Sequence, residues 1–196
     1  MPVMSAVEVA FCRSAPWRVL ARRVVLPWAL GGEELTGDVL EIGGGSGAMA
    51  DGIAQLFPDV RLTVTDIDDA MVTSARHRLA HRGNVTVRQA DVTALPFGDA
   101  SFDAVTSYLM LHHVTAWREA LGEAARVLRP GGAFLGYDLT DTRAARLTHR
   151  LDRSPHLLLS ADGLRIGLAE AGFDDVEVRP SASGHLMRFG AKRSVG

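Results

Sequence analysis

The chain has 196 residues, of which 47% are hydrophobic and 22% are charged, and its formal net charge is −2. A chain of this size and hydrophobic content is sufficient for one compact domain and is not typical of a disordered protein. The nearly balanced charge disfavours a nucleic-acid-binding protein, which would normally carry a basic excess. Cys12 is the single cysteine, so neither an intramolecular disulfide nor a thiolate-rich metal site is expected, and a reducing, cytoplasmic compartment is favoured.

Residues 1–36 are predicted to form an N-terminal helical cap, followed by a single domain over 37–196. Large apolar residues recur in the cap at helical spacing and predict a packing face made of Trp17, Leu20, Val24 and Trp28. This helix could pack on the domain, cover a pocket or attach to a membrane surface, and an Arg-rich start leaves an organelle presequence open. Stable membrane insertion is not expected, because the apolar stretch 24–30 is far shorter than the roughly 20 residues of a spanning helix.

After residue 36, short runs of β type alternate with helical patterns. Strands are predicted at 38–42, 60–65, 84–89, 102–107 and 133–137, and helices at 47–57, 68–80 and 115–128. The first of these helices should bury Met49, Ile53 and Leu56. Such alternation predicts an α/β fold with a parallel sheet and helices on both of its faces.

The last part of the chain has a different pattern. Ser160 can cap a helix over 160–171, and strands are predicted at 175–179 and 185–191. The link 180–184 is too short for a crossover helix, so these two strands should be antiparallel. A further helix is predicted at 141–151.

A glycine-rich turn stands where the first strand meets the first helix, in the run Glu41-Ile42-Gly43-Gly44-Gly45-Ser46-Gly47. Glycines allow a tight turn and a close ligand approach, and the free N–H groups of the following helix point into the same crevice. This crevice lies at the carboxyl ends of the strands, where open α/β sheets bind ligands. A purely structural turn remains an alternative, and Gly43-x-Gly45-x-x-Ala48 also fits a relaxed dinucleotide fingerprint.

Two further carboxylates follow predicted strands. Asp66 ends the second strand and can accept hydrogen bonds from both hydroxyls of a ribose, while Ile67 offers an apolar wall for an adenine ring. Asp91 and Val92 follow the third strand, where the carboxylate and the Val92 N–H could read an adenine edge. For Asp91 a simple turn role is an equal alternative.

Together these stretches resemble the class I S-adenosylmethionine-dependent methyltransferases, and most closely the small type 11 group that includes ubiquinone- and menaquinone-pathway-like enzymes. The matching segments are VLEIGGGSG (39–47), LTVTDID (62–68), ADVTALPFGDASFDAVTSYLMLHHV (90–114) and RVLRPGG (126–132). They cover nearly all of residues 38–138 in the family's order. The resemblance implies a Rossmann-like, seven-stranded, mostly parallel sheet with an antiparallel last strand and helices on both faces.

The resemblance also implies the cofactor, S-adenosyl-L-methionine, with S-adenosyl-L-homocysteine as product. The residues implied or suggested to bind it are Glu41, Gly43, Gly45, Gly47, Asp66, Ile67, Asp91, Val92 and Ser107. In the family pattern the glycines line the methionine and ribose part, and Glu41 helps to hold the amino group. Asp91 and Val92 take the adenine, and Ser107 with Tyr108 flanks the methionine and the sulfonium, where an aromatic face suits a cation.

Catalysis of methyl transfer depends mainly on alignment, helped by a base where the acceptor is an acid. His113 follows the fourth strand and titrates in the suitable range, so it is a candidate base, with a structural or substrate-orienting role as the alternative. Asp138 ends the fifth strand and faces the same crevice, or serves as the cap of the next helix. Tyr108 is the third candidate, and no zinc-ligand spacing is present among the histidines.

These patterns predict an enzyme that transfers a methyl group from S-adenosylmethionine to a small-molecule acceptor. The segment Ser107-Tyr108-Leu109-Met110 differs from the Asn-Pro-Pro-Tyr type of amide- and adenine-methylating relatives, which disfavours glutamine and adenine as acceptors. No nucleic-acid partner is expected. The alternatives are a non-catalytic cofactor-binding module of the same fold and an NAD(P)-dependent oxidoreductase.

Overall fold

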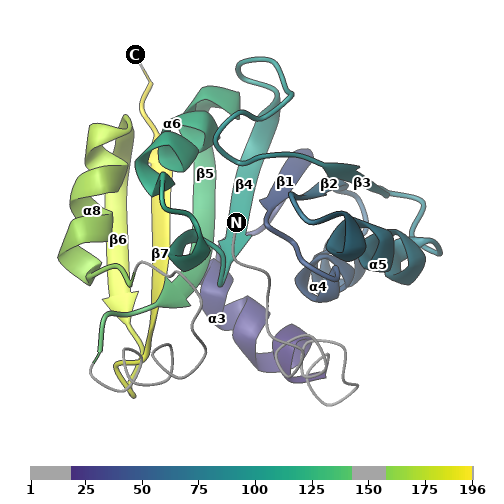
Figure 1. Ribbon diagram of the computed structural model, residues 1–196, viewed down its shortest axis with the longest axis horizontal. Helices are drawn as coiled ribbons and strands as arrows, with labels where there is room; N and C mark the ends of the chain where they lie inside the picture. Colours follow the sequence, from purple (N-terminus) through teal and green to yellow (C-terminus); the bar gives the residue numbers. More distant parts are fainter. Residues whose placement is uncertain (1–18, 143–157, 196) are drawn as a thin grey trace.

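The computed structural model describes residues 19–142 and 158–195. These residues form a seven-stranded sheet with the order β3-β2-β1-β4-β5-β7-β6 (Figure 1). The strands are Asp38–Ile42 (β1), Arg61–Asp66 (β2), Val85–Gln89 (β3), Phe102–Tyr108 (β4), Leu128–Leu139 (β5), Phe173–Pro180 (β6) and Leu186–Arg193 (β7).

The sheet is parallel except at one strand. β1 pairs in parallel with β2 and β4, and the parallel pairing continues from β2 to β3 and from β4 to β5. β7 is antiparallel to both of its neighbours, β5 and β6. This arrangement confirms the predicted Rossmann-like fold with an antiparallel last strand.

Helices cover both faces of the sheet. They are Leu26–Leu30 (α3), Ala48–Leu56 (α4), Asp69–Leu79 (α5), Trp117–Val127 (α6) and Ala161–Glu170 (α8), with a π-helical turn at Ala21–Val25 (η1) and a 3₁₀ turn at Leu111–His113 (η2). Two separate apolar clusters result, one under α6 and α8 and one under α3, α4 and α5. Neighbouring strand residues such as Phe134 and Leu135 contribute to opposite clusters, as the two-residue period of a strand requires.

Of the packing face predicted for the N-terminal helix, Trp28 is confirmed, because it packs against the cluster under α3, α4 and α5 and its ring lies 5.7 Å from the ring of Tyr137. The prediction is wrong at Leu20 and Val24. Leu20 and Val24 are 46% and 57% exposed, and the buried residues are instead Leu26, Ala29 and Leu30. The cause is the π-helical turn at Ala21–Val25, which adds a residue to one turn and rotates the following side chains away from the regular spacing. Trp17 and the rest of the cap up to residue 18 lie outside the described residues.

Two smaller expectations also need correction. Leu56 on α4 is 45% exposed, because the buried side of this helix is centred between Met49 and Ala54, with Leu56 at its edge. The fifth strand begins at Leu128 rather than at residue 133, directly after α6 ends at Val127. The helix predicted at 141–151 lies, from residue 143 onwards, outside the described residues.

The predicted antiparallel hairpin and its helix are confirmed. Ser160 caps α8 by accepting a hydrogen bond from the Gly163 N–H at 3.0 Å. Within residues 19–142 and 158–195, each helix is too short or too polar to cross a membrane.

Candidate functional site

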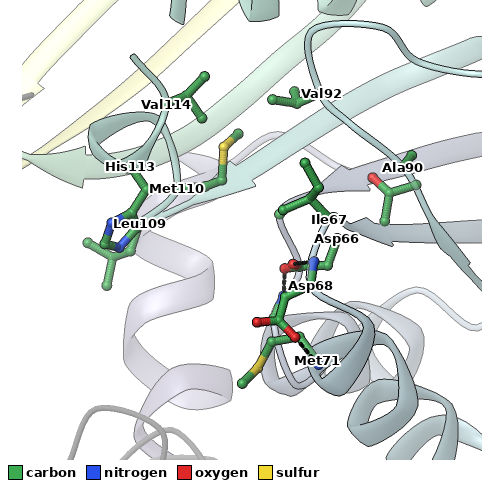
Figure 2. A pocket seen from close by; sticks show the side chains of 13 residues that line it. Asp66, Ile67, Asp68, Met71, Ala90, Val92, Leu109, Met110, His113 and Val114 are labelled. Atoms are coloured by element: carbon green, nitrogen blue, oxygen red, sulfur yellow. Dashed lines mark hydrogen bonds between the residues drawn. The ribbon is translucent and has the colours of Figure 1, made fainter. Parts of the chain in front are cut away.

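A pocket opens at the carboxyl ends of β1, β2 and β4 (Figure 2). Of the residues that the sequence suggested, the pocket is lined by Gly43, Gly45, Asp66, Ile67, Val92 and His113. The remaining walls come from residues that no motif singled out as binding residues, chiefly Met71, Leu109, Met110 and Val114. The pocket therefore joins the glycine-rich turn, the end of β2 and the segment after β4, as the parallel topology requires.

The glycine-rich turn forms one wall of this pocket and needs glycine for two different reasons. Gly43 has φ +63°, and a Cβ there would overlap the side chain of Met110. Gly45 has φ +53°, and its Cβ position has no atom within 4 Å among the described residues. The space above Gly45 is thus available to a ligand. Gly47 instead faces α5, since its Cβ would lie 2.9 Å from Leu79, and it does not line the pocket.

Asp66 connects the glycine-rich turn to the turn after β2. Its Oδ2 accepts a hydrogen bond from the Gly45 N–H at 2.8 Å, and its Oδ1 accepts one from the Asp68 N–H at 2.9 Å. Burial is the main cause that raises its pKa above the ordinary value. Each carboxylate oxygen has two acceptor sites, so both oxygens keep capacity for a ligand while the backbone fixes their position.

Glu41 lies beside the glycine-rich turn, near Gly44, is 1% exposed and is not itself among the residues that line the pocket. Its Oε2 has no hydrogen-bond partner among the described residues. Burial, and to a smaller extent the charge of Asp66, raises its pKa to about 8. A buried carboxyl with an open acceptor site is a suitable partner for a cationic ligand group, which would both satisfy it and favour its ionised form.

Two polar groups on β4 are also buried without a hydrogen-bond partner in the described part of the chain. The Ser107 Oγ and the Tyr108 OH are buried and have no hydrogen-bond partner among the described residues. Burial, together with the nearby Glu41, raises the pKa of Tyr108 well above its usual value, so its hydroxyl stays protonated. Neither residue lines the pocket directly. Tyr108 lies near Glu41 on the same face of the sheet, whereas the Ser107 side chain points to the opposite face. A buried polar group without a partner requires an explanation, and a polar ligand end beside Glu41 and Tyr108 would supply one.

Asp91 and Val92 have separate surroundings. Val92 is 7% exposed and lines the pocket. Asp91 is exposed, and its Oδ1 accepts hydrogen bonds from the Thr93 N–H at 2.9 Å and the Thr93 hydroxyl at 2.7 Å. The turn role that the sequence left open is therefore present, and Asp91 itself is not among the lining residues.

Asp138 and His112 form a buried pair behind the pocket. Asp138 is fully buried, and its Oδ1 lies 2.5 Å from the His112 Nδ1. The backbone N–H groups of Leu111 and Leu139 also donate to this carboxylate, at 2.7 and 2.6 Å. The His112 ring lies 3.9 Å from the His113 ring, and His113 lines the pocket. Asp138 thus fixes the turn η2 that carries both histidines and does not itself reach the pocket.

Sequence reasoning missed this pairing, because it depends on the neighbours and the register of the strands. Tyr108 and Tyr137 are register partners on β4 and β5, so residues just beyond the two strand ends must lie close together. Leu109 was also missed: it has φ +53°, rare for a residue other than glycine, and it lines the pocket. No pattern in the sequence announces such a backbone conformation.

Comparison with known proteins agrees with this geometry. Residues 40–136 match the family model described as a methyltransferase domain. Residues 40–136 belong to this methyltransferase-domain family. The match covers the part of the sheet from β1 to β5 that builds the pocket.

Two relatives differ in the acceptor that their names state. The chain is 35% identical over 129 residues to a ubiquinone/menaquinone biosynthesis C-methyltransferase UbiE of Marinomonas sp. (strain MWYL1), covering 64% of this chain and 51% of the relative. It is 32% identical over 172 residues to a malonyl-(acyl-carrier protein) O-methyltransferase of Geobacter sulfurreducens, covering 82% of this chain and 64% of the relative. The chain therefore spans about half of the first relative's length and under two thirds of the second's.

Among solved structures, the crystal structure of the (4+2)-cyclase SpnF matches with a TM-score of 0.76 at 20% identity, covering 94% of this chain and 85% of that one. The likeness establishes the fold. Because a cyclase has the same fold, the activity of this protein must be argued from its site.

Proposed function

We propose that this protein is an S-adenosylmethionine-dependent methyltransferase that acts on a small-molecule acceptor and releases S-adenosylhomocysteine. Two carboxyl groups near the glycine-rich turn carry the proposal. Asp66 is held by the Gly45 backbone at the open side of the pocket, and the buried Oε2 of Glu41 has no hydrogen-bond partner among the described residues. These two carboxyl groups suit the ribose hydroxyls and the ammonium group of the same ligand.

The chain's own residues suit three parts of the cofactor, namely its ribose, its ammonium group and its adenine. Asp66 would accept from the ribose hydroxyls, and Glu41 would hold the ammonium group. Ile67 and Val92 are apolar pocket residues and would flank the adenine, with Asp91 at its edge. The cofactor, when bound, supplies a methyl group already activated by a sulfonium.

The chemical contribution of the protein is then alignment, water exclusion and control of one proton. Alignment of reactants in a closed site is worth about 7–11 kcal/mol in the most favourable intramolecular cases. Met71, Met110 and Val114 provide apolar walls, which strengthen the remaining electrostatic interactions. His113 would take a proton from an acidic acceptor, while Asp138 and His112 hold its orientation through the contacts in η2.

We further propose that residues 37–196 are the catalytic domain, with 1–36 as a cap that packs on it, and that the protein works in the cytoplasm. The packing is supported by Leu26, Ala29 and Leu30, which share one apolar cluster with α4 and α5. The location is supported by the single cysteine, which suits a reducing compartment.

Calorimetric titration tests the cofactor. The protein is titrated in parallel with S-adenosylmethionine, S-adenosylhomocysteine and NADH, and only the two sulfur nucleotides are expected to bind. Asp66→Ala should weaken their binding by about 1.5–3 kcal/mol, the range for hydrogen bonds to a charged group. The matched control is Asp69→Ala, an exposed carboxylate three residues away on α5, which should bind like wild type. Binding of NADH alone would make the glycine-rich turn a dinucleotide site.

Turnover tests the role of His113. An acceptor is first found by screening phenols, enols and carboxylic acids for release of S-adenosylhomocysteine. His113→Ala should then lower turnover about 10²- to 10⁴-fold, the usual contribution of a general base, with cofactor affinity unchanged. The control is His77→Ala, an exposed histidine on α5. Wild-type turnover in a folded His113→Ala variant would leave this residue only a structural role, and cofactor binding with no methylation of any acceptor would favour the non-catalytic module.

A further inference from the structure

The segment between β3 and β4 has no regular secondary structure, yet it builds part of the pocket. Residues 90–101 form this segment, and Ala90 and Val92 at its start line the pocket. A loop without its own ladder of hydrogen bonds needs other partners to hold one conformation. Whatever holds this segment therefore bears on the shape of the pocket.

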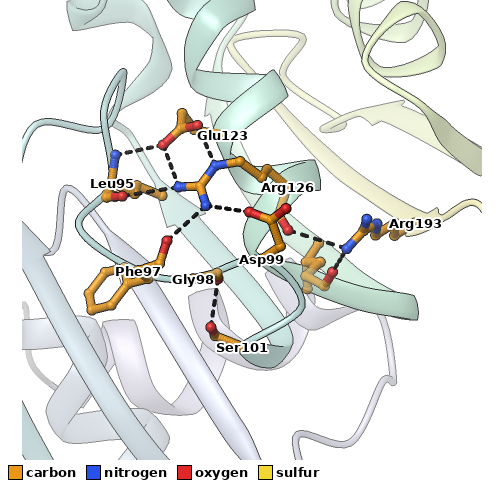
Figure 3. Close-up of polar contacts among 9 residues, drawn as sticks. Leu95, Phe97, Gly98, Asp99, Ser101, Glu123, Arg126 and Arg193 are labelled. Atoms are coloured by element: carbon orange, nitrogen blue, oxygen red, sulfur yellow. Dashed lines mark hydrogen bonds and ion pairs between the residues drawn. The ribbon is translucent and has the colours of Figure 1, made fainter.

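Two side chains of α6, Arg126 and Glu123, hold the segment (Figure 3). Glu123 Oε2 accepts from the Leu95 N–H at 2.7 Å, and Arg126 Nη2 donates to the Leu95 carbonyl at 3.0 Å. Arg126 Nη1 also donates to the Phe97 carbonyl at 2.8 Å and to Asp99 Oδ1 at 2.9 Å. The two side chains are joined to each other by contacts of 2.7 and 2.8 Å.

The geometry of this pair uses the planar fork of arginine. One edge of the guanidinium meets Glu123, while the remaining donors reach the backbone of two loop residues. A lysine has a single ammonium and cannot make the same set of bonds. Together the pair satisfies both backbone polar groups of Leu95, whose side chain is buried in the same apolar cluster as Val92.

We propose that Arg126 and Glu123 are positioning residues for the cofactor: by holding the backbone of Leu95 and Phe97, they keep Val92 in place as part of the adenine wall. Ala90, at the start of the segment, is held separately, because its N–H donates to the Asp66 carbonyl at 3.0 Å. Neither Arg126 nor Glu123 lines the pocket. This inference rests on the proposed function and deepens it, because it connects Arg126, which is remote from the pocket, to the adenine wall.

Arg129 is a matched control for a merely stabilising role. It lies three residues from Arg126, is 38% exposed against 31%, and also pairs with two carboxylates, Asp38 at 3.2 Å and Asp103 at 2.7 Å. Its partners are at the opposite, amino-terminal ends of β1 and β4. Loss of Arg129 should therefore lower stability without moving the adenine wall.

The experiment compares Arg126→Gln, Arg126→Lys and Arg129→Gln with wild type. The dissociation constants of S-adenosylhomocysteine and of adenosine are measured by calorimetry, and the exchange of the Leu95 amide hydrogen is followed by mass spectrometry or NMR. Both Arg126 variants should bind both ligands about tenfold more weakly, because both lose the fork, and should exchange the Leu95 amide at least tenfold faster. Arg129→Gln should bind within twofold of wild type even where its melting temperature falls.

Unchanged affinity in folded Arg126 variants, or an equal loss in Arg129→Gln, would overturn the positioning role. Should Arg126→Gln fail to fold, Arg126→Lys decides, since it keeps the charge and the aliphatic stem. A wild-type protein that binds neither S-adenosylhomocysteine nor adenosine would overturn the proposed function itself, and this inference with it. Wild-type binding with unaffected variants would overturn this inference alone.

Discussion

At the scale of single residues, Glu41 is a buried carboxyl group with one oxygen that has no hydrogen-bond partner among the described residues. It is buried beside the glycine-rich turn, and its pKa is raised to about 8 from 4.5. Near neutral pH the folded protein without ligand therefore holds a proton on this group. A ligand cation would favour the ionised form, so binding and proton release are coupled at this residue.

The raised pKa predicts a pH dependence of stability. Between about pH 4.5 and 8 the unfolded chain has lost the Glu41 proton while the folded chain keeps it. The unfolded state then binds fewer protons, so Glu41 makes the free energy of unfolding decrease as pH rises, by up to about 1.4 kcal/mol per pH unit. Urea unfolding at pH 5.5, 6.5, 7.5 and 8.5 should show a flatter profile in Glu41→Gln.

The control for that profile is Glu119→Gln, an exposed glutamate on α6, which should keep the wild-type slope. A Glu41→Gln profile parallel to wild type would mean that Glu41 is ionised in the folded protein.

Several residues of the pocket wall could be predicted from their own positions in the sequence. Gly43, Gly45 and Asp66 each follow or end a strand, and position along a parallel strand is enough to place them at its carboxyl end. The His112–Asp138 pair could not be predicted from sequence position, because it depends on which strands are neighbours and on their register. Local patterns carry no information on either.

At the scale of elements, α6 serves two purposes on its two sides. Its apolar side contributes Trp117, Leu121 and Ala124 to the cluster under the sheet. Its polar side carries Glu123 and Arg126 to the loop that forms the pocket wall. The helix was predicted correctly because a sustained period of 3.6 residues is a strong signal, whereas the single extra residue of the η1 π-turn has no such signal.

Substitutions on the apolar side of α6 are predicted to lower the free energy of unfolding more than substitutions on its exposed side. Leu121 is fully buried, so Leu121→Ala should lower the free energy of unfolding by about 2–5 kcal/mol through lost burial and the cavity left behind. Glu119→Ala, exposed on the same helix, should change it by less than about 0.5 kcal/mol. Urea denaturation measures both, and a loss below about 1 kcal/mol for Leu121→Ala would indicate a core that repacks freely.

At the scale of the whole molecule, the pocket lies where both apolar clusters end. Val92 and Met110 belong to the cluster under α6 and α8, while Leu109 packs against the cluster under α3, α4 and α5. A ligand in the pocket therefore touches both halves of the core and has no equivalent site in the unfolded chain. Binding should stabilise the fold as a unit.

A thermal shift measures this coupling. S-adenosylhomocysteine at 100 times its dissociation constant should add about 2.7 kcal/mol, which corresponds to a rise of roughly 5–10 °C in Tm for a chain of this size. NADH at the same concentration should leave Tm unchanged. The Asp66→Ala variant should need a higher ligand concentration for the same rise, and an equal response of wild type and variant would speak against the ribose contact.

The position of β7 has a consequence for how the molecule assembles. Leu186–Arg193 follows β6 in the chain but lies between β5 and β6 in the sheet (Figure 1). β6 is hydrogen-bonded to β7 and to no other described strand, so β6 has no place on the sheet until β7 has docked on β5. During synthesis, the edge of β5 that will pair with β7 stays without a hydrogen-bonded neighbour until β7 has been made. Pairings between strands far apart in the sequence also form slowly. In the interval before β7 is synthesised, the open edge of β5 thus exposes the growing chain to association with other chains.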